Sequence, residues 1–147
     1  MEELIQKLKI AMADSVVFRL KTQQYHWNVE GPDFYEYHLL FQRIYEEVDG
    51  SIDIFGEQIR TLDAYAPLSP KRIFDLTNIE DSAVSLKPLE MVRILYNDNN
   101  IVLNSVLDTY KIAEKFNELG LSNFLQDRIT AHKTHLYLLR SVLKTQE

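Results

Sequence analysis

Four side chains in the first half of the chain are of types that bind transition metals: His26, His38, Asp53 and Glu57. The two histidines flank the break at Gly31-Pro32, and the two carboxylates stand four residues apart. On a helix that spacing places both carboxylates on one face. Mixed imidazole and carboxylate ligation suits Fe(II), with manganese and zinc as competitors. Core histidines and a solvated charged face are the alternatives, so the interpretation depends on the helices that hold these groups.

The sequence predicts an all-α fold. Only four glycines and four prolines occur in 147 residues, which favours long helices over a turn-rich β protein. Apolar residues recur at helical spacing in four segments, 3–28, 34–62, 88–119 and 122–144. We expect the third helix to end at Gly120. Four long helices with one long crossover in the middle are typical of a ferritin-like four-helix bundle, here a single domain over residues 1–147.

The connection over 63–87 is too long to lack structure of its own. Within it, the stretch SPKRIFDLT predicts a short extra helix with Ser69 as N-cap and Pro70 in the first position. Before the second long helix, Asp33 and Glu36 have the spacing of a capping box. The apolar row of that helix is expected to face the bundle core. Its members are Phe34, Tyr37, Phe41, Ile44, Val48, Ile52, Phe55, Ile59 and Leu62.

The polar groups of the second helix lie off this row. At about 100° per residue, four of them centre roughly 130° from the apolar direction: His38, Gln42, Asp53 and Glu57. Gly50 and Gly56 stand in the same helix, where each costs about 1 kcal/mol relative to alanine. Glycine is useful there if another backbone approaches closely. The polar flank is therefore expected to be a protein interface.

Distance along the second helix separates the candidate ligands. His38 and Asp53 are fifteen residues apart, about 22 Å along a helix axis. One ion therefore cannot bind both side chains within one chain. Two copies of the helix, packed antiparallel about a twofold axis, would bring His38 of one copy beside Asp53 and Glu57 of the other. The spacing thus predicts a metal site shared between two chains.

One run of the sequence resembles the signature of the Dps family (DNA-binding proteins from starved cells), the small cage-forming branch of the ferritin superfamily. This run is KTQQYHWNVEGPDFYEYHLLFQRIYEEVDGSIDIFGEQIRTL. A weaker likeness covers nearly the whole chain, including Met91, Leu95 and Asp98 of the Pro-led third long helix. The matching positions of the signature are His26-Trp27, Val29, Gly31-Pro32, Phe34, His38, Phe41, Tyr45, Asp53 and Glu57.

The resemblance implies a hollow shell of twelve bundles that oxidises Fe(II), preferably with hydrogen peroxide, and stores a ferric mineral. Fe(II) would be the substrate and Fe(III) the product of this ferroxidase, which would protect the cell and its DNA from oxidative stress. The centre would lie at the twofold interface, with His26 and His38 from one subunit and Asp53 and Glu57 from the other. The alternative that keeps the fold is a structural or DNA-protecting shell with little ferroxidase activity.

One departure from the family pattern lies in the expected centre. Gln42 stands four residues after His38, where family members commonly have an aspartate. A neutral amide is a poor iron ligand, so the second metal position of the centre would lack its usual carboxylate. Glu46 and Asp49 on the same flank are candidates to compensate.

A second departure concerns the acidic pore through which iron enters in this family, near the start of the last helix. Glu118 and Asp127 are present there, but Asn123 replaces a usual acid. We expect slower or differently placed iron entry. The ferritin site inside one bundle needs Glu-x-x-His motifs, and none of the four histidines follows a glutamate at that spacing.

For the remaining candidates, a role in packing has to be weighed against a role in chemistry. His132 lies on the apolar row of the last helix and is expected to be a hydrogen-bonded core histidine. His135 would pair with it as an i, i+3 ligand set, but no carboxylate is seen to complete that site. Tyr25 and Trp27 stand beside His26 in what we expect to be an aromatic cover. They serve either packing or the uptake of electron holes during iron oxidation.

Charge and composition limit the kinds of partner that the protein can bind. Asp plus Glu number 22 and Lys plus Arg 16, for a net charge of −6, which opposes binding to nucleic acid and to anionic membranes. No Lys/Arg-rich tail is visible, so we expect direct DNA binding to be weak or absent. The absence of cysteine excludes thiolate sites. The start of the sequence does not resemble a signal peptide and no apolar run is long enough to span a membrane, so we expect a cytosolic protein.

Overall fold

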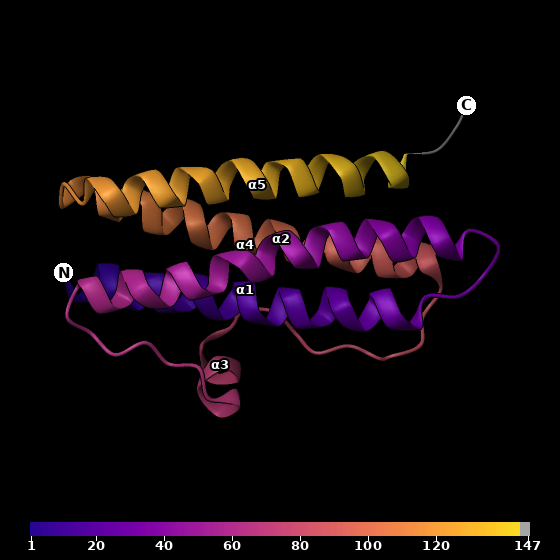
Figure 1. The fold of residues 1–147 in the computed structure, drawn as a ribbon, viewed down its shortest axis with the longest axis horizontal. Coiled ribbons are helices and arrows are strands. Elements are labelled where there is room, and N and C mark those ends of the chain that lie inside the picture. Colours follow the sequence, from indigo (N-terminus) through magenta and orange to yellow (C-terminus); the bar gives the residue numbers. More distant parts are fainter. Residues whose placement is uncertain (145–147) are drawn as a thin grey trace.

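The computed structural model describes residues 1–144, and in that range it contains four long helices and one short helix, with no strand. Figure 1 shows the long helices side by side, with the short α3 set against the outside of α1. Helix α1 packs on α2 and α4, α4 packs on α5, and α2 touches α5. The predicted all-α bundle with a short extra helix is confirmed. The elements are α1 Glu2–Asn28, α2 Phe34–Thr61, α3 Pro70–Leu76, α4 Pro88–Lys115 and α5 Leu119–Leu143.

The apolar row of α2 forms the side of the helix that faces the core. Five of its members are completely buried, namely Phe41, Ile44, Val48, Phe55 and Ile59. Phe34, at the first position of the helix, is 39% exposed and does not belong to the core. Burial of apolar surface provides the main free energy that holds such a bundle together. The same burial fixes the opposite flank of α2 toward the outside.

The turn between α4 and α5 corrects the predicted helix end. Helix α4 ends at Lys115, and Gly120 lies in the first turn of α5. The chain reverses at Asn117, whose φ of 54° is left-handed. The Asn117 N–H donates to Glu114 O at 3.0 Å and the Glu118 N–H to Ala113 O at 3.1 Å, the pattern of a Schellman motif. Asparagine tolerates this backbone conformation. The prediction that the helix continues to Gly120 was therefore wrong.

The crossover between α2 and α4 is tied to the bundle through buried polar groups. Ser69 caps α3 as predicted and accepts a hydrogen bond from the Arg72 N–H. Further along, the completely buried Asp14 of α1 accepts hydrogen bonds from Thr77 Oγ1 and the Asn78 N–H, each at 2.7 Å, and from Ser105 Oγ of α4 at 2.5 Å. These bonds satisfy a carboxylate that would otherwise be costly to bury.

A buried ion pair holds the second half of the crossover. Lys21 Nζ donates to Glu80 O at 2.7 Å and lies 2.8 Å from Asp98 Oδ2 on α4. Burial raises the pKa of Asp98 even though Lys21 acts against that rise. The Tyr25 hydroxyl shares a hydrogen bond with Ser82.

None of the described helices is both long enough and apolar enough to cross a membrane.

Candidate metal centre

The turn between α1 and α2 brings the two N-terminal histidines together. Gly31 has φ +123°, a left-handed conformation that glycine adopts without strain. Asp33 occupies the N-cap position of α2 but makes no side-chain cap hydrogen bond, so the predicted capping box does not form. The rings of His26 and His38 are stacked with centroids 3.7 Å apart and planes 15° apart. We call these two residues the histidine pair.

Two reciprocal hydrogen bonds fix the tautomers of the histidine pair. His26 Nδ1 lies 2.7 Å from His38 O, and His38 Nδ1 lies 2.8 Å from His26 O. A carbonyl oxygen only accepts, so both Nδ1 atoms carry the proton. In this tautomer the lone pair of each ring is on Nε2, and no group of residues 1–144 hydrogen-bonds to either Nε2 atom. Such a bond on the opposite nitrogen is how proteins orient histidine for metal binding.

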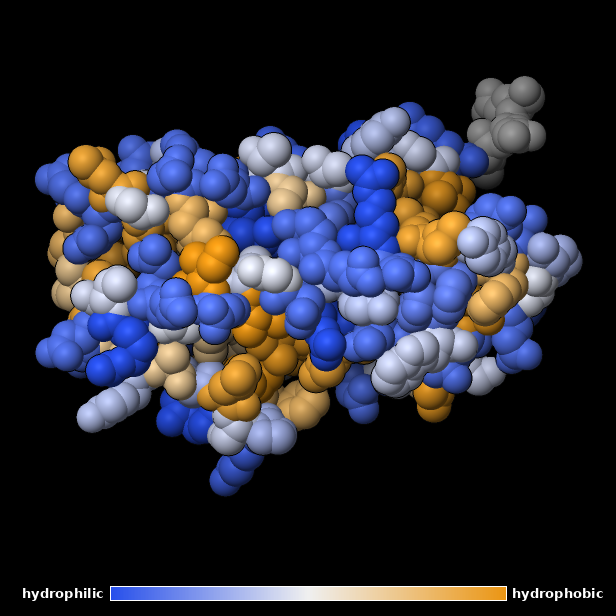
Figure 2. Space-filling view, in the orientation of Figure 1, coloured by the Kyte–Doolittle hydropathy of each residue, from blue (hydrophilic) through white to orange (hydrophobic). Residues whose placement is uncertain are grey.

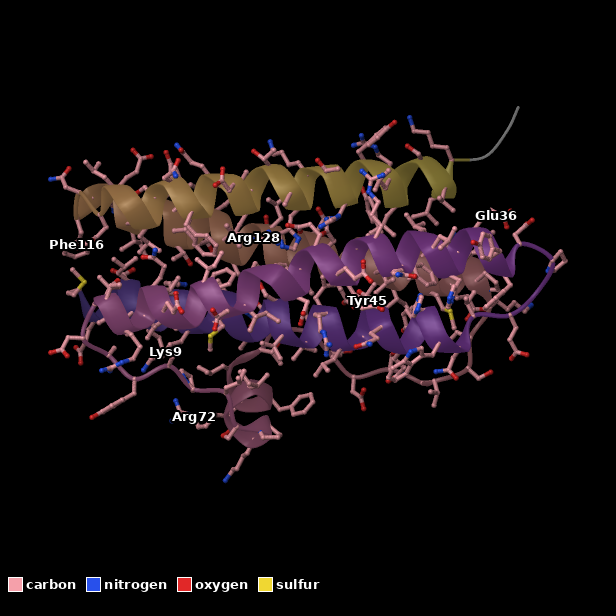
Figure 3. All side chains as sticks on the ribbon, in the orientation of Figure 1. Lys9, Glu36, Tyr45, Arg72, Phe116 and Arg128 are labelled. Carbon is pink, nitrogen blue, oxygen red and sulfur yellow. The ribbon has the colours of Figure 1, made fainter. Side chains whose placement is uncertain are left out.

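The aromatic surroundings of the histidine pair differ from the prediction. Tyr25 is completely buried in the core, whereas Trp27 is 67% exposed. The neighbours are Tyr45, whose ring meets that of His26 edge-on at 5.1 Å, and Phe34, 4.9 Å from the His38 ring. Figure 3 shows Tyr45 on α2 turned toward α1. His38 and Tyr45 are seven residues, or about two helical turns, apart and therefore share one face of α2. This spacing could have indicated that Tyr45 lies beside the histidine pair.

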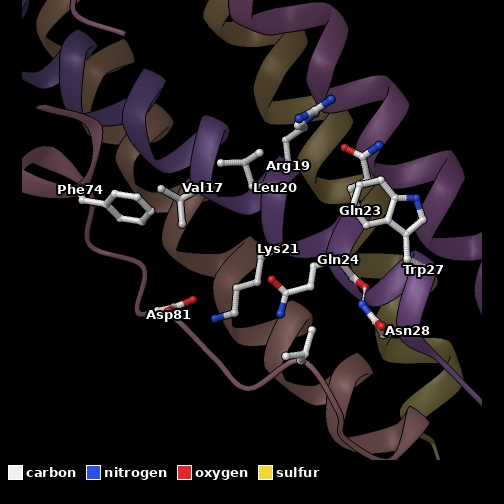
Figure 4. A pocket seen from close by; sticks show the side chains of 11 residues that line it. Val17, Arg19, Leu20, Lys21, Gln23, Gln24, Trp27, Asn28, Phe74 and Asp81 are labelled. Atoms are coloured by element: carbon white, nitrogen blue, oxygen red, sulfur yellow. Dashed lines mark hydrogen bonds between the residues drawn. The ribbon is translucent and has the colours of Figure 1, made fainter. Parts of the chain in front are cut away.

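Trp27 belongs to a different surface. It lines an open groove of about 520 Å³ between α1, α3 and the crossover, together with Leu20 and Phe74. Figure 4 shows these side chains around the groove, with Lys21 and Asp81 at one side. On the face drawn in Figure 2, hydrophobic residues gather beside α3. The predicted aromatic cover over His26 is therefore not formed by Trp27 or Tyr25.

Asp53 and Glu57 lie together on α2, as predicted from their spacing. Both are exposed and line an open groove of about 470 Å³, whose walls include Gly56, Arg60 and residues 66–68. We call them the carboxylate pair. The structure does not bring them to the histidine pair within one chain. Among residues 1–144, no group of three or more histidines and carboxylates is arranged to hold a metal ion.

The auxiliary candidates on the same flank are engaged with other side chains. Gln42 Nε2 donates to Glu46 Oε1 at 2.9 Å. Asp49 Oδ1 lies 3.2 Å from Arg19 Nε, in an ion pair whose carboxylate is exposed and whose arginine is mostly buried. Asp49 is thus paired with a cation, whereas Glu46 is hydrogen-bonded to a neutral amide.

The two glycines of α2 have free space above them. A Cβ at Gly50 would meet no atom within 4 Å, and one at Gly56 would meet only Ala66 Cβ at 3.9 Å. No backbone of the same chain therefore explains them. Their place on the flank that holds the carboxylate pair keeps the partner interface as a prediction.

The predicted pore residues gather at the start of α5. Glu118 is the N-cap residue and is half-buried, while Asn123 and Asp127 are exposed. Residues four apart on a helix share one face, so Asn123 and Asp127 point to the same side of α5. Their assignment to an iron-entry pore stays a prediction.

A second histidine and carboxylate cluster lies inside the bundle. His132 is completely buried and bonded to Asn99, so its predicted core role is confirmed. His135 is also buried, and its Nε2 lies 2.8 Å from Glu47 Oε1. Glu47 of α2 therefore reaches His135, but among residues 1–144 these groups are not arranged as a three-ligand metal site. Arg128, His132 and His135 share one face of α5 at i, i+4 and i+7, which was the signal missed.

The charges of this cluster are strongly perturbed. Burial alone would raise the pKa of Glu47, but hydrogen bonds from His135 and Arg128 outweigh it and lower the pKa to about 2. Burial and the nearby Arg128 hold the pKa of His132 well below its usual value. Glu47 is therefore ionised and His132 neutral at pH 7. We call Glu47, Asn99, Arg128, His132 and His135 the core cluster.

The sequence matches the ferritin-like domain family over residues 5–147. An uncharacterized low temperature-induced protein of Nostoc is 29% identical over 145 residues, which cover 97% of this chain and 81% of that protein. DNA protection during starvation protein 2 of Bacillus anthracis is 25% identical over 142 residues and is covered to 97%, as is this chain.

Solved structures share the fold over nearly the whole length. Dps from Thermosynechococcus elongatus superposes with a TM-score of 0.94 at 24% identity, covering 99% of this chain and 93% of that one. Dps from Vibrio cholerae O1, a member of a broad superfamily of ferritin-like diiron-carboxylate proteins, superposes with a TM-score of 0.92 at 27% identity, covering 97% and 90%. The chain belongs to the ferritin-like family, in its Dps branch.

Proposed function

We propose that this protein is a ferroxidase and iron store whose centre is assembled between two subunits. Membership of the family supports iron storage and protection against oxidative stress. One observation carries the finer proposal: each chain presents two incomplete ligand sets. The histidine pair offers two free Nε2 lone pairs, and the carboxylate pair offers four exposed oxygens about 22 Å along α2. Each set lacks what the other provides.

A twofold axis between antiparallel α2 helices would join the histidine pair of one subunit to the carboxylate pair of the other. The resulting imidazole and carboxylate set suits Fe(II) as substrate, with zinc and manganese as competing occupants. The two carboxylates balance the charge of the ion, and their charge favours the Fe(III) product over Fe(II). The backbone carbonyls that accept the Nδ1 protons hold both rings in the binding orientation.

The proposed oxidant is hydrogen peroxide. Each Fe(II) gives up one electron, so two Fe(II) reduce one peroxide, and two protons complete the two water molecules formed. Consumption of Fe(II) and peroxide together removes the reactants that generate hydroxyl radical. Protection of DNA would then be indirect, which agrees with a net charge of −6. The ferric product would be stored inside a shell of twelve subunits.

The test is to add Fe(II) and peroxide to metal-free protein under anaerobic conditions and follow ferric absorbance. We expect rapid oxidation with soluble iron retained at the protein, and a mass near twelve times 17.3 kDa by light scattering. A variant with Asp53→Ala and Glu57→Ala should lose the rapid phase, while Glu90→Gln, an exposed change on α4, should keep it. A monomer with unchanged oxidation would remove the shared centre.

A further inference from the structure

The guanidinium of Arg128 lies in the middle of the bundle. The residue is 4% exposed, and Figure 3 shows it between α5 and α2. Its Nη1 donates to Glu47 Oε2 at 2.6 Å and its Nη2 to Glu47 Oε1 at 3.0 Å. Nη2 also lies 3.2 Å from His132 Nε2. One cationic group is therefore held by a carboxylate and an imidazole at once.

The hydrogen bonds fix which nitrogen of His132 faces Arg128. Asn99 Nδ2 donates to His132 O at 2.9 Å, which leaves Asn99 Oδ1 to accept from His132 Nδ1 at 2.8 Å. His132 Nε2 then carries the lone pair, and it accepts from Arg128. His135 Nε2, 2.8 Å from Glu47 Oε1, donates to that carboxylate. The acceptors around the guanidinium are an ionised carboxylate and a neutral imidazole lone pair, the same groups that act as ligands to divalent metals.

Bundle cores are where carboxylate and histidine metal sites are commonly built, from side chains on facing helices. We propose that the Arg128 guanidinium is a resident cation that fills such a site in this chain and keeps divalent metal out of the bundle interior. Without it, Glu47 and His132 provide a carboxylate and an Nε2 ligand to a divalent cation.

The surroundings of Arg128 support a cation site over a simple structural ion pair. Arg128 Nε and His135 Nδ1 are buried and have no hydrogen-bond partner among the described residues. An arrangement selected only for stability would leave fewer such groups, because each costs free energy. Glu47 is 39% exposed at its side chain, so an ion has a route from solvent to this carboxylate. The core cluster thus combines ligands, access and a blocking charge.

The test is a titration with Co(II) on the full chain, followed by visible absorption and calorimetry, with His26→Ala and His38→Ala present throughout to silence the proposed centre. Arg128→Ala should bind one additional Co(II) per chain. Arg128→Lys, which retains a cation, should not. Adding Glu47→Gln to Arg128→Ala should weaken that binding at least tenfold. A folded Arg128→Ala protein with no additional Co(II) would overturn the proposal, as would equal binding by Arg128→Lys.

Loss of the arginine also removes contacts, so folding provides a second readout. If Arg128→Ala does not fold in metal-free buffer, added Co(II) should restore helical circular dichroism and raise the melting temperature. The same addition should leave Arg128→Ala with Glu47→Gln unfolded. Failure of Co(II) to restore Arg128→Ala would contradict the proposal. Neither readout depends on iron oxidation, so the inference can fail while the proposed function stands, and the reverse.

Discussion

The flank of α2 and the interior of the bundle hold similar side chains in opposite states. On the flank, the histidine pair has free Nε2 atoms and the carboxylate pair is exposed, and the two sets lie far apart in one chain. In the interior, the core cluster joins histidine and carboxylate within 3 Å, with Arg128 bound between helices. The ligand types alone therefore do not predict a metal site. In the interior a cation of the chain itself, Arg128, lies among these groups, whereas on the flank the two sets stay apart within one chain.

Removal of the core carboxylate should have the largest effect. Glu47→Gln leaves Arg128 buried without its counter-charge, which we expect to cost about 3 kcal/mol of unfolding free energy. The value is at the lower end for such pairs because Glu47 is 39% exposed at its side chain. Urea unfolding measures it. Glu36→Gln on the same helix is the control, with a change within about 0.5 kcal/mol, and equal losses in both variants would erase the contrast between the regions.

On the flank the expectation is reversed, with activity lost and the helical fold kept. His26→Ala or His38→Ala should reduce the Fe(II) oxidation rate at least about tenfold, since even the groups that orient metal ligands are worth that much. The helical content should not change. Stopped-flow absorbance gives the rate and circular dichroism the fold. A histidine variant that unfolds, or one that oxidises iron normally, would show that the pair is structural.

Acidification should weaken the interior of the bundle. The pKa of His132 is held well below 6.5 by burial and by Arg128, so the unfolded chain binds a proton that the folded chain does not. Stability therefore falls as the pH drops below about 6.5, by at most about 1.4 kcal/mol per pH unit. The pKa of Glu47 is lowered from 4.5 to about 2. Its contribution is present above pH 4.5 and is lost as the pH falls toward 2.

Thermal unfolding between pH 7 and pH 5 measures the first of these windows. His132→Gln keeps a polar side chain at the position but does not titrate, and it should flatten the dependence of melting temperature on pH. An unchanged slope in this variant would assign the pH dependence to other groups. Variants of the carboxylate pair should retain the slope of the parent chain.

The smallest effect is expected for DNA. With a net charge of −6, the protein should not shift duplex DNA at neutral pH and about 150 mM salt. A mobility-shift titration with and without divalent metal is the measurement. Tight metal-free binding would reveal a basic surface formed on assembly, and it would place a further function on the outside of the bundle.

Local patterns predicted most of the fold. The apolar row of α2 and the Ser69 cap depend on neighbours within a few residues, and both agree with the structure. The end of α4 was misplaced, because Asn117 adopts the left-handed turn that Gly120 was expected to make. The pairing of His135 with Glu47 joins residues 88 apart, and nothing in the sequence pattern specifies that two helices present those groups to each other.

The positions of the candidate ligands were predicted from the sequence, but their surroundings were not. The spacing of Asp53 and Glu57 placed them together, and the axial distance separated them from His38, as found. Tyr25 and Trp27 adjoin His26 in sequence, yet consecutive residues on a helix point about 100° apart. Tyr25 consequently enters the core and Trp27 the outer groove. Sequence adjacency was the misleading signal.

Mixed shells test the central claim of a centre shared between subunits most directly. One inactive variant carries His26→Ala and His38→Ala, the other Asp53→Ala and Glu57→Ala. In a dimer of the two, one site collects every damaged position and the other keeps all four intact ligands. Equal co-assembly should therefore restore about a quarter of the wild-type Fe(II) oxidation rate, because half of the dimers are mixed and each has one intact site. Preformed shells mixed afterwards should restore none, and co-assembled shells of confirmed mass without activity would contradict the shared centre.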